Sequence, residues 1–100
     1  MMFDTAHFNA MTAGDAGLQR EIVDLFRGQL PEWTEKLASK DAQIRKDAAH
    51  KIKGSALGIG LPALTAACAA AEADPGDAEA MRQLALALAE ALSALQAAYP

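Results

Sequence analysis

The residues with the clearest chemical potential in this sequence surround His50. At about 100° per residue, the positions expected to face a protein core lie on the opposite side of the segment from His50; they are Ile44, Ala48, Ile52, Ser55 and Ile59. His50 is therefore expected to point to water. Lys53 follows three residues later, so the two side chains can meet on one helical face. A cation there favours the neutral, nucleophilic form of an imidazole.

Two further residues on that face suit the approach of another molecule. Gly54 lies in the middle of the expected helix, where glycine costs about 1 kcal/mol relative to alanine. Free access to His50 would explain that cost. Leu57 adds an apolar side chain to the same face, which suits docking. The same residues also fit a solvated helix face with an unused histidine, ending in a leucine that turns back to the core.

Charge and composition limit the classes of partner. The net charge of −4 argues against nucleic acid, although five cations and only two anions lie between Lys40 and Lys53. Cys68 is the single cysteine, which excludes an internal disulfide and a cysteine-based zinc site, and we expect it in the core. The most apolar stretch, Leu84 to Ala98, is shorter than the ~20 residues of a membrane span. With no signal peptide evident at the start, we expect a soluble cytoplasmic protein with no membrane partner.

The elements that must position His50 are predicted to be helices. Hydrophobic residues make up 52% of the chain, mostly alanine and leucine, and no alternating strand pattern occurs. Pro31 should kink or divide the second of these helices. Helix starts are predicted at Asp4 or Thr5, Asp15, Asp41, Pro62 and Asp77. Short connections between amphipathic helices predict one all-α domain over residues 1–100, an antiparallel up-down four-helix bundle with a short additional N-terminal helix.

The stretch from His50 to Glu72 reads HKIKGSALGIGLPALTAACAAAE. It resembles the signature of the histidine-containing phosphotransfer (HPt) domain family. The matching residues are His50, Lys53, Gly54, Ser55, Gly60, Leu64, Cys68 and Glu72. Three positions depart from the usual pattern: Lys51 replaces a small polar residue, Leu61 an alanine and Ala71 a leucine. Lys51 makes the site more basic and could alter partner choice.

The resemblance implies a phosphoryl carrier rather than an enzyme. His50 would accept a phosphoryl group from a receiver-domain aspartate or a histidine kinase and pass it to another receiver. The receiver would supply magnesium and its carboxylates, so this chain needs no cofactor or metal of its own. Lys53 would assist electrostatically, and Glu72 would bond the inner ring nitrogen and fix the tautomer. Lys46, Lys51, Gly54 and Leu57 would form the docking surface.

Other interpretations stay open at this point. The chain could be the histidine-bearing domain of a chemotaxis-type kinase, although it contains no ATP-binding sequence. It could also be a helical interaction module without phosphotransfer, which the set of His50, Lys53 and Gly54 argues against. A metal-binding bundle has little support from two distant histidines. His7 has no cationic neighbour and is expected to be idle or to pack. We expect a monomer, since no feature of the sequence demands a dimer.

Overall fold

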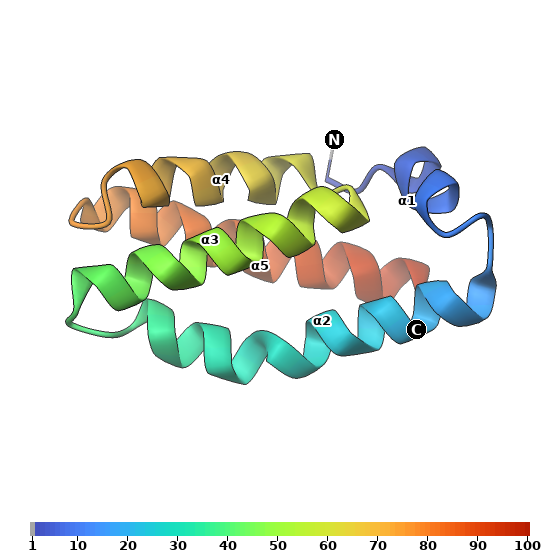
Figure 1. The fold of residues 1–100 in the computed structure, drawn as a ribbon, viewed down its shortest axis with the longest axis horizontal. Coiled ribbons are helices and arrows are strands. Elements are labelled where there is room, and N and C mark those ends of the chain that lie inside the picture. The colour runs from blue at the N-terminus through green and yellow to red at the C-terminus, as the bar shows by residue number, and fades with distance from the viewer. Residues whose placement is uncertain (1) are drawn as a thin grey trace.

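The computed structural model describes residues 2–100, and within them it contains helices and no strand. The helices are α1 (Thr5–Met11), α2 (Ala16–Leu37), α3 (Ala42–Ile59), α4 (Pro62–Ala73) and α5 (Ala78–Ala98). The four longer helices run antiparallel to their neighbours in chain order, and α1 lies across one end of them (Figure 1). The predicted four-helix bundle with a short N-terminal helix is confirmed. None of the helices within residues 2–100 is long and apolar enough to cross a membrane.

The predicted helix starts are confirmed by their capping contacts. At each of four starts an aspartate carboxylate accepts a hydrogen bond from a backbone N–H of the first turn, which otherwise lacks a partner. The four aspartates are Asp4, Asp15, Asp41 and Asp77, with distances of 2.9–3.1 Å. Pro62 occupies the first turn of α4, as expected for a residue without an N–H.

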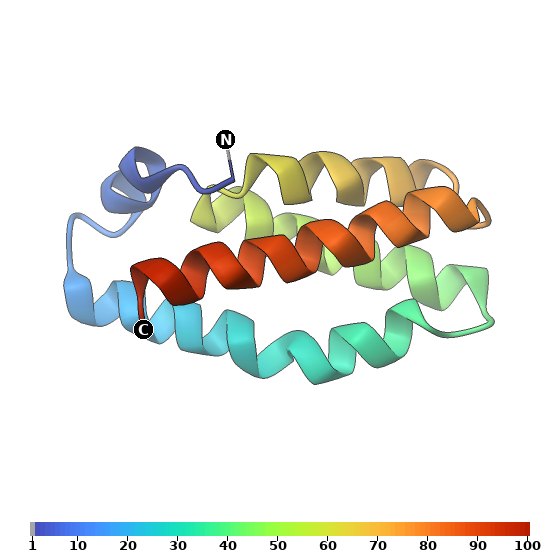
Figure 2. The ribbon, with the colours of Figure 1, turned by 180° about the vertical axis from the view of Figure 1, so that it is seen from behind.

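Pro31 does not divide α2, which continues as one helix from Ala16 to Leu37. The ribbon of α2 instead bends near its middle (Figure 2). A proline inside a helix removes one backbone hydrogen bond and crowds the carbonyl four residues earlier, which accounts for a bend. Of the two predicted outcomes, a kink or a division, the first is observed.

The core lies between the four long helices and is built from small and large apolar side chains. On α3 its centre is the line of Ala49, Ile52, Ala56 and Ile59, all buried. The prediction that Ile44 faces the core is wrong, because the buried residues are centred on a face that is rotated away from Ile44 and leaves it exposed. Ser55, also predicted to face the core, is half-buried.

The same rotation occurs on α2. The helical stripe predicted there is Leu18, Ile22, Leu25, Phe26, Leu30, Trp33 and Leu37. The structure buries Phe26 and Trp33, with ring centroids 5.3 Å apart, together with Val23. Leu18 and Leu25 are exposed, since they lie to one side of that buried line. On α4, Cys68 is buried in the core, as expected.

The N-terminal segment is tied to the C-terminal end of α3. The backbone N–H of Asp4 donates to the carbonyl of Gly60 at 2.7 Å, and Nε2 of His7 donates to the carbonyl of Leu57 at 3.1 Å. Carbonyls at the end of a helix have no partner within the helix, so these contacts satisfy them. His7 is therefore a helix-capping residue, beside the fully buried Phe8.

A buried polar network joins α1 to α2 and α5. Nε2 of Gln19 donates to Oδ1 of Asn9 at 2.8 Å and to Oγ1 of Thr12 at 2.9 Å. The hydroxyl of Tyr99 donates to Oε1 of Gln19 at 3.0 Å. Because a buried amide is costly unless it is hydrogen-bonded, these contacts fix the position of α1 on the bundle.

Candidate functional site

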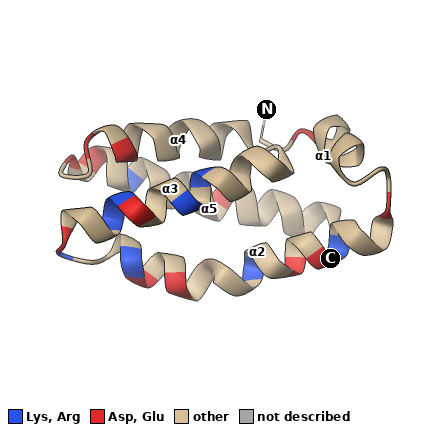
Figure 3. Cartoon of the chain, viewed as in Figure 1, with Lys and Arg blue, Asp and Glu red and all other residues tan. Residues whose placement is uncertain are grey.

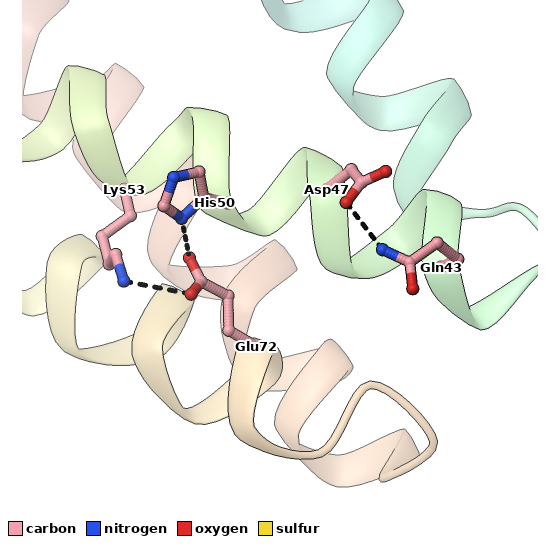
Figure 4. A network of polar contacts seen from close by, with 5 residues as sticks. All are labelled: Gln43, Asp47, His50, Lys53 and Glu72. Carbon is pink, nitrogen blue, oxygen red and sulfur yellow. Dashed lines mark hydrogen bonds and ion pairs between the residues drawn. The ribbon is translucent and has the colours of Figure 1, made fainter.

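His50 lies near the middle of α3, on the side opposite the buried Ile52. Its side chain is 73% exposed, whereas those of Lys53 and Glu72 are 26% and 18% exposed. The structure therefore places the histidine at the surface, as the helical register predicts. It also brings Glu72, on α4, next to His50 and Lys53 on α3 (Figure 4).

Glu72 contacts both of the other residues, through different oxygens. Its Oε1 is 3.1 Å from Nδ1 of His50, and its Oε2 accepts from Nζ of Lys53 at 3.0 Å. An ionised carboxylate can only accept hydrogen bonds, so Nδ1 carries the proton in this arrangement. The lone pair then lies on Nε2, which points away from Glu72 (Figure 4). Glu72 thus directs the nucleophilic nitrogen outward.

Several effects act on the ionisation of Glu72. Partial burial on its own raises the pKa of Glu72, but the hydrogen bond and positive charge of Lys53, with a smaller contribution from the contact with His50, outweigh it and lower the pKa. Glu72 is therefore a carboxylate at neutral pH. Lys53 acts on His50 through this carboxylate, an arrangement that differs from the direct meeting of Lys53 and His50 expected from their spacing alone.

The surface next to His50 is open at Gly54. A Cβ atom built on Gly54 meets no other atom within 4 Å, so glycine is not required there by packing inside the chain. Leu57, one turn further along α3, is exposed. The structure thus leaves both residues on the outside of the bundle near His50, where the sequence predicts them.

Lys46 and Lys51 are also exposed. Lys51 faces α2, where it lines a groove of about 640 Å³ beside His50, together with Glu32, Glu35, Lys36 and Asp47. Figure 3 shows that charged residues of both signs lie along α2 and α3 in this part of the molecule. The lysines are therefore interspersed with carboxylates, which the sequence did not reveal because it does not specify how each helix is rotated about its axis.

Arg45 is another residue that sequence reasoning missed. Its guanidinium donates from Nη1 to the carbonyl of Ser39 at 2.7 Å, and from Nε and Nη2 to the carbonyl of Pro75 at 3.1 and 2.9 Å. It therefore braces the turn before α3 against the turn after α4. Since Glu72 lies just before that second turn, Arg45 supports the register between Glu72 and His50. No local sequence signal distinguishes this arginine from a solvated one.

The other polar residues near the site have structural roles. Burial raises the pKa of the Cys68 thiol to about 12, with a smaller contribution from the Glu72 carboxylate, so the thiol stays protonated. Asp47 accepts from Nε2 of Gln43 at 2.8 Å, a contact along α3 that does not reach His50 (Figure 4). Within residues 2–100, no group of three or more His, Cys, Asp or Glu residues could hold a metal ion.

The chain also matches the model of a known protein family. The model of the family described as "Hpt domain" matches residues 20–98, which include α3, α4, α5 and most of α2. His50, Lys53 and Glu72 all lie inside the matched range, whereas α1 lies outside it. No curated protein and no solved structure gives a significant match to the chain.

Proposed function

Because the chain belongs to the histidine-containing phosphotransfer domain family, we propose that it carries a phosphoryl group on Nε2 of His50 between response-regulator receiver domains, or from a histidine kinase to a receiver. Members of this family are phosphoryl carriers of phosphorelay signalling rather than catalysts. The observation that carries the assignment of His50 is its exposed ring, held by Glu72 through Nδ1. We propose further that residues 1–100 act as one domain, as a monomer in the cytoplasm.

The transfer step uses the lone pair of Nε2. This lone pair attacks the phosphorus of an aspartyl phosphate on the receiver, forming the N–P bond. The P–O bond to the aspartate breaks, and its electron pair leaves with the aspartate carboxylate. The proton on Nδ1 stays in its hydrogen bond to Glu72. Onward transfer reverses these changes, with the carboxylate of a second receiver as the nucleophile.

Lys53 and Glu72 stabilise different charges during this step. With the phosphoryl group on Nε2 and the proton on Nδ1, the ring carries a positive charge, which the Glu72 carboxylate balances. The ammonium of Lys53 holds the other oxygen of Glu72, and its positive charge would offset the negative charge of a phosphoryl group on the ring. Both are positioning and electrostatic groups, while the magnesium ion and its carboxylates come from the receiver.

The docking surface consists of Lys46, Lys51, Gly54 and Leu57. A receiver active site that binds magnesium is acidic, so the two lysines speed encounter, and added salt slows it. Gly54 leaves the space through which the aspartyl phosphate reaches Nε2. Leu57 supplies apolar contact area that salt hardly affects.

The direct test is to mix the protein with a phosphorylated receiver domain and analyse the phosphate that it acquires. The expected product is an acid-labile, alkali-stable phosphate on His50, mapped by mass spectrometry under alkaline conditions. Phosphate on His7 or on a hydroxyl group would contradict the assignment of His50. A chain that accepts phosphate from neither receivers nor histidine kinases would favour an interaction module.

A further inference from the structure

A second groove lies between α2 and α5, on the side of the bundle that Figure 2 shows from the front. It has a volume of about 480 Å³ and is lined mainly by Leu30, Leu37, Met81, Ala85 and Ala89. None of the residues that line it is charged. We call this surface the α2–α5 groove.

Leu86 lies beside this groove, on the outer side of α5, and is 45% exposed. Its neighbours Ala85 and Ala89 are exposed as well, and both line the groove. Their small side chains leave space for an apolar side chain of another molecule. A large exposed apolar residue next to an uncharged groove indicates a contact surface, whereas a single exposed leucine alone would be ordinary.

Two opposite charges lie at equal distances from Leu86. Arg82 is four residues before it and Glu90 four residues after it, so the three side chains form one ridge along α5, which we call the α5 ridge. Arg82 donates to Glu79 through Nε at 2.9 Å and Nη2 at 2.6 Å, and its Nη1 makes no hydrogen bond within residues 2–100. Glu90 has no ion-pair partner in the same part of the chain. A donor and a carboxylate are therefore available on opposite sides of Leu86.

We infer that the α5 ridge is a contact surface for a second copy of this chain, with the two α5 helices antiparallel about a two-fold axis at Leu86. Such an axis sets each residue opposite the residue at the same distance on the other side of Leu86. Arg82 of each copy then meets Glu90 of the other, and the two Leu86 side chains meet between them, next to the α2–α5 groove. Ridges of residues four apart pack alongside each other when helices cross at about 50°.

The symmetry of the charges favours a second copy over an unrelated partner. A two-fold contact requires a surface that is complementary to itself. The α5 ridge meets this requirement, because its two charges are opposite in sign and equally spaced from Leu86. An unrelated partner places no such condition on the spacing.

The size of the contact predicts a weak and reversible pairing. An α5 helix is about 31 Å long and about 10 Å wide, so one helix crossing covers only part of its surface. A stable interface covers about 800 Å² on each partner, which is more than this crossing provides. We therefore expect a dissociation constant of about 10–100 µM.

Pairing through α5 leaves phosphoryl transfer to each single chain, as proposed above. Around the bundle α3 contacts α2 and α4, whereas α5 contacts α4 and α2, so the α3–α4 face lies opposite the α2–α5 groove. His50 and Glu72 meet across that opposite face. Both sites therefore stay open in the pair, and the inference does not depend on the proposed function.

The test measures self-association of the full chain by sedimentation equilibrium at about 10 µM to about 1 mM. Arg82→Glu and Glu90→Arg each set like charges opposite one another, twice in every pair. The double variant Arg82→Glu/Glu90→Arg sets opposite charges together again. Because positions 82 and 90 are about 12 Å apart along one helix, a rescue by the double variant must occur between copies.

The control is Glu21→Arg, which reverses an exposed charge in a depression lined by α2 residues alone. Melting by circular dichroism reports whether each variant is folded. Chemical phosphorylation of His50 by phosphoramidate, which needs no partner protein, reports whether the site itself is intact.

We expect each single reversal to raise the dissociation constant about tenfold, while the double variant and Glu21→Arg stay within about threefold of the parent. An equimolar mixture of the Arg82→Glu and Glu90→Arg chains should associate as well as the parent, because each charge then faces its opposite. Leu86→Gln should also weaken the pairing about tenfold.

A parent that stays monomeric at about 1 mM would overturn the inference and leave the proposed function standing. A double variant that dissociates like the single ones would overturn the antiparallel arrangement. A monomeric parent whose transfer to a receiver slows in Leu86→Gln would overturn the pairing and assign the α5 ridge to contact with the receiver.

Discussion

The middle of α3 and its C-terminal end show how one helix can serve two purposes. At the C-terminal end the chain satisfies its own groups: Asp4 and His7 bond the carbonyls of Gly60 and Leu57, and Phe8 is buried beneath them. In the middle, His50 is exposed and Gly54 faces open space. The difference separates residues that the fold needs from residues that only a partner uses. Substitutions at the two regions should therefore affect different measurements.

The largest contrast is expected between His50 and Phe8. His50→Gln should abolish phosphoryl uptake and leave the melting temperature within about 2 °C of the parent, because an exposed side chain contributes little to stability. Uptake is measured with a labelled receiver phosphate, and melting by circular dichroism. Phosphorylation retained in this variant would overturn the assignment of the acceptor.

Phe8→Ala is the reciprocal change. It should lower the free energy of unfolding by about 3–5 kcal/mol, because it empties a fully buried site. The fraction that stays folded should still accept phosphate from phosphoramidate at the parental rate. If this variant kept its stability, α1 would contribute nothing to the bundle and the division between the two regions would be wrong.

Two glycines of α3 and its cap provide the next contrast. Gly54→Gln should raise helix propensity and leave the bundle as stable or more stable, by up to about 1 kcal/mol. The new side chain stands one turn from His50, in the space that a receiver must enter, so transfer should fall by orders of magnitude. Both quantities are measured on one preparation, by denaturant unfolding and by rapid-quench transfer. Normal transfer would refute the close-approach argument, and unfolding would make Gly54 a packing residue.

Gly60→Ala should behave in the opposite way. Gly60 has a φ of +95°, and a Cβ atom there would lie 3.0 Å from the carbonyl oxygen of Asp4 and from Cδ2 of His7. We expect a loss of about 1–2 kcal/mol in stability from the left-handed backbone alone. Transfer by the folded protein should stay within about twofold of the parent, and a larger loss would mean that α1 and the site are coupled.

A smaller effect is expected for Lys53. Lys53→Ala removes the ion pair to Glu72, so transfer should slow about tenfold while the affinity for the receiver changes little. Lys46→Ala is the matched control, since Lys46 is exposed on the same side of α3 and belongs to the docking surface. Lys46→Ala should instead slow the encounter with the receiver and make the encounter rate less dependent on salt. Equal behaviour of the two variants would show that Lys53 acts only as surface charge.

The smallest effect concerns acid stability. The pKa of Glu72 is lowered in the folded protein: partial burial opposes the shift, but Lys53 and His50 outweigh it. Its contribution to stability is therefore complete above the pKa of an unfolded glutamate, about 4.3, and is lost as the pH falls through the lower folded value. The difference in unfolding free energy between the parent and Glu72→Gln should shrink between about pH 5.5 and pH 3. A difference that stays constant with pH would show that the carboxylate is not held in its ionised form.

The parts of the structure that the sequence predicted well depend on short-range patterns. Aspartate caps, Pro62 and the helical register around His50 act over one turn, so they are visible in the chain itself. The resemblance to HPt domains also named Glu72, which lies 22 positions from His50. Tertiary packing determined the rest. Three features depend on which helices meet and at what rotation, and no local pattern specifies them. They are the exposure of Ile44 and Leu25, the capping role of His7, and the groove lined by α2.

The bracing by Arg45 has a consequence for local opening of the molecule. One guanidinium bonds carbonyls of two turns that are far apart in the sequence, at Ser39 and Pro75. The end of α4 that carries Glu72 and the start of α3 should therefore unfold together, as one cooperative unit in native-state hydrogen exchange. Breaking this link would let the α4 end fray alone, and the imidazole would then lose its orientation for part of the time in an otherwise folded bundle.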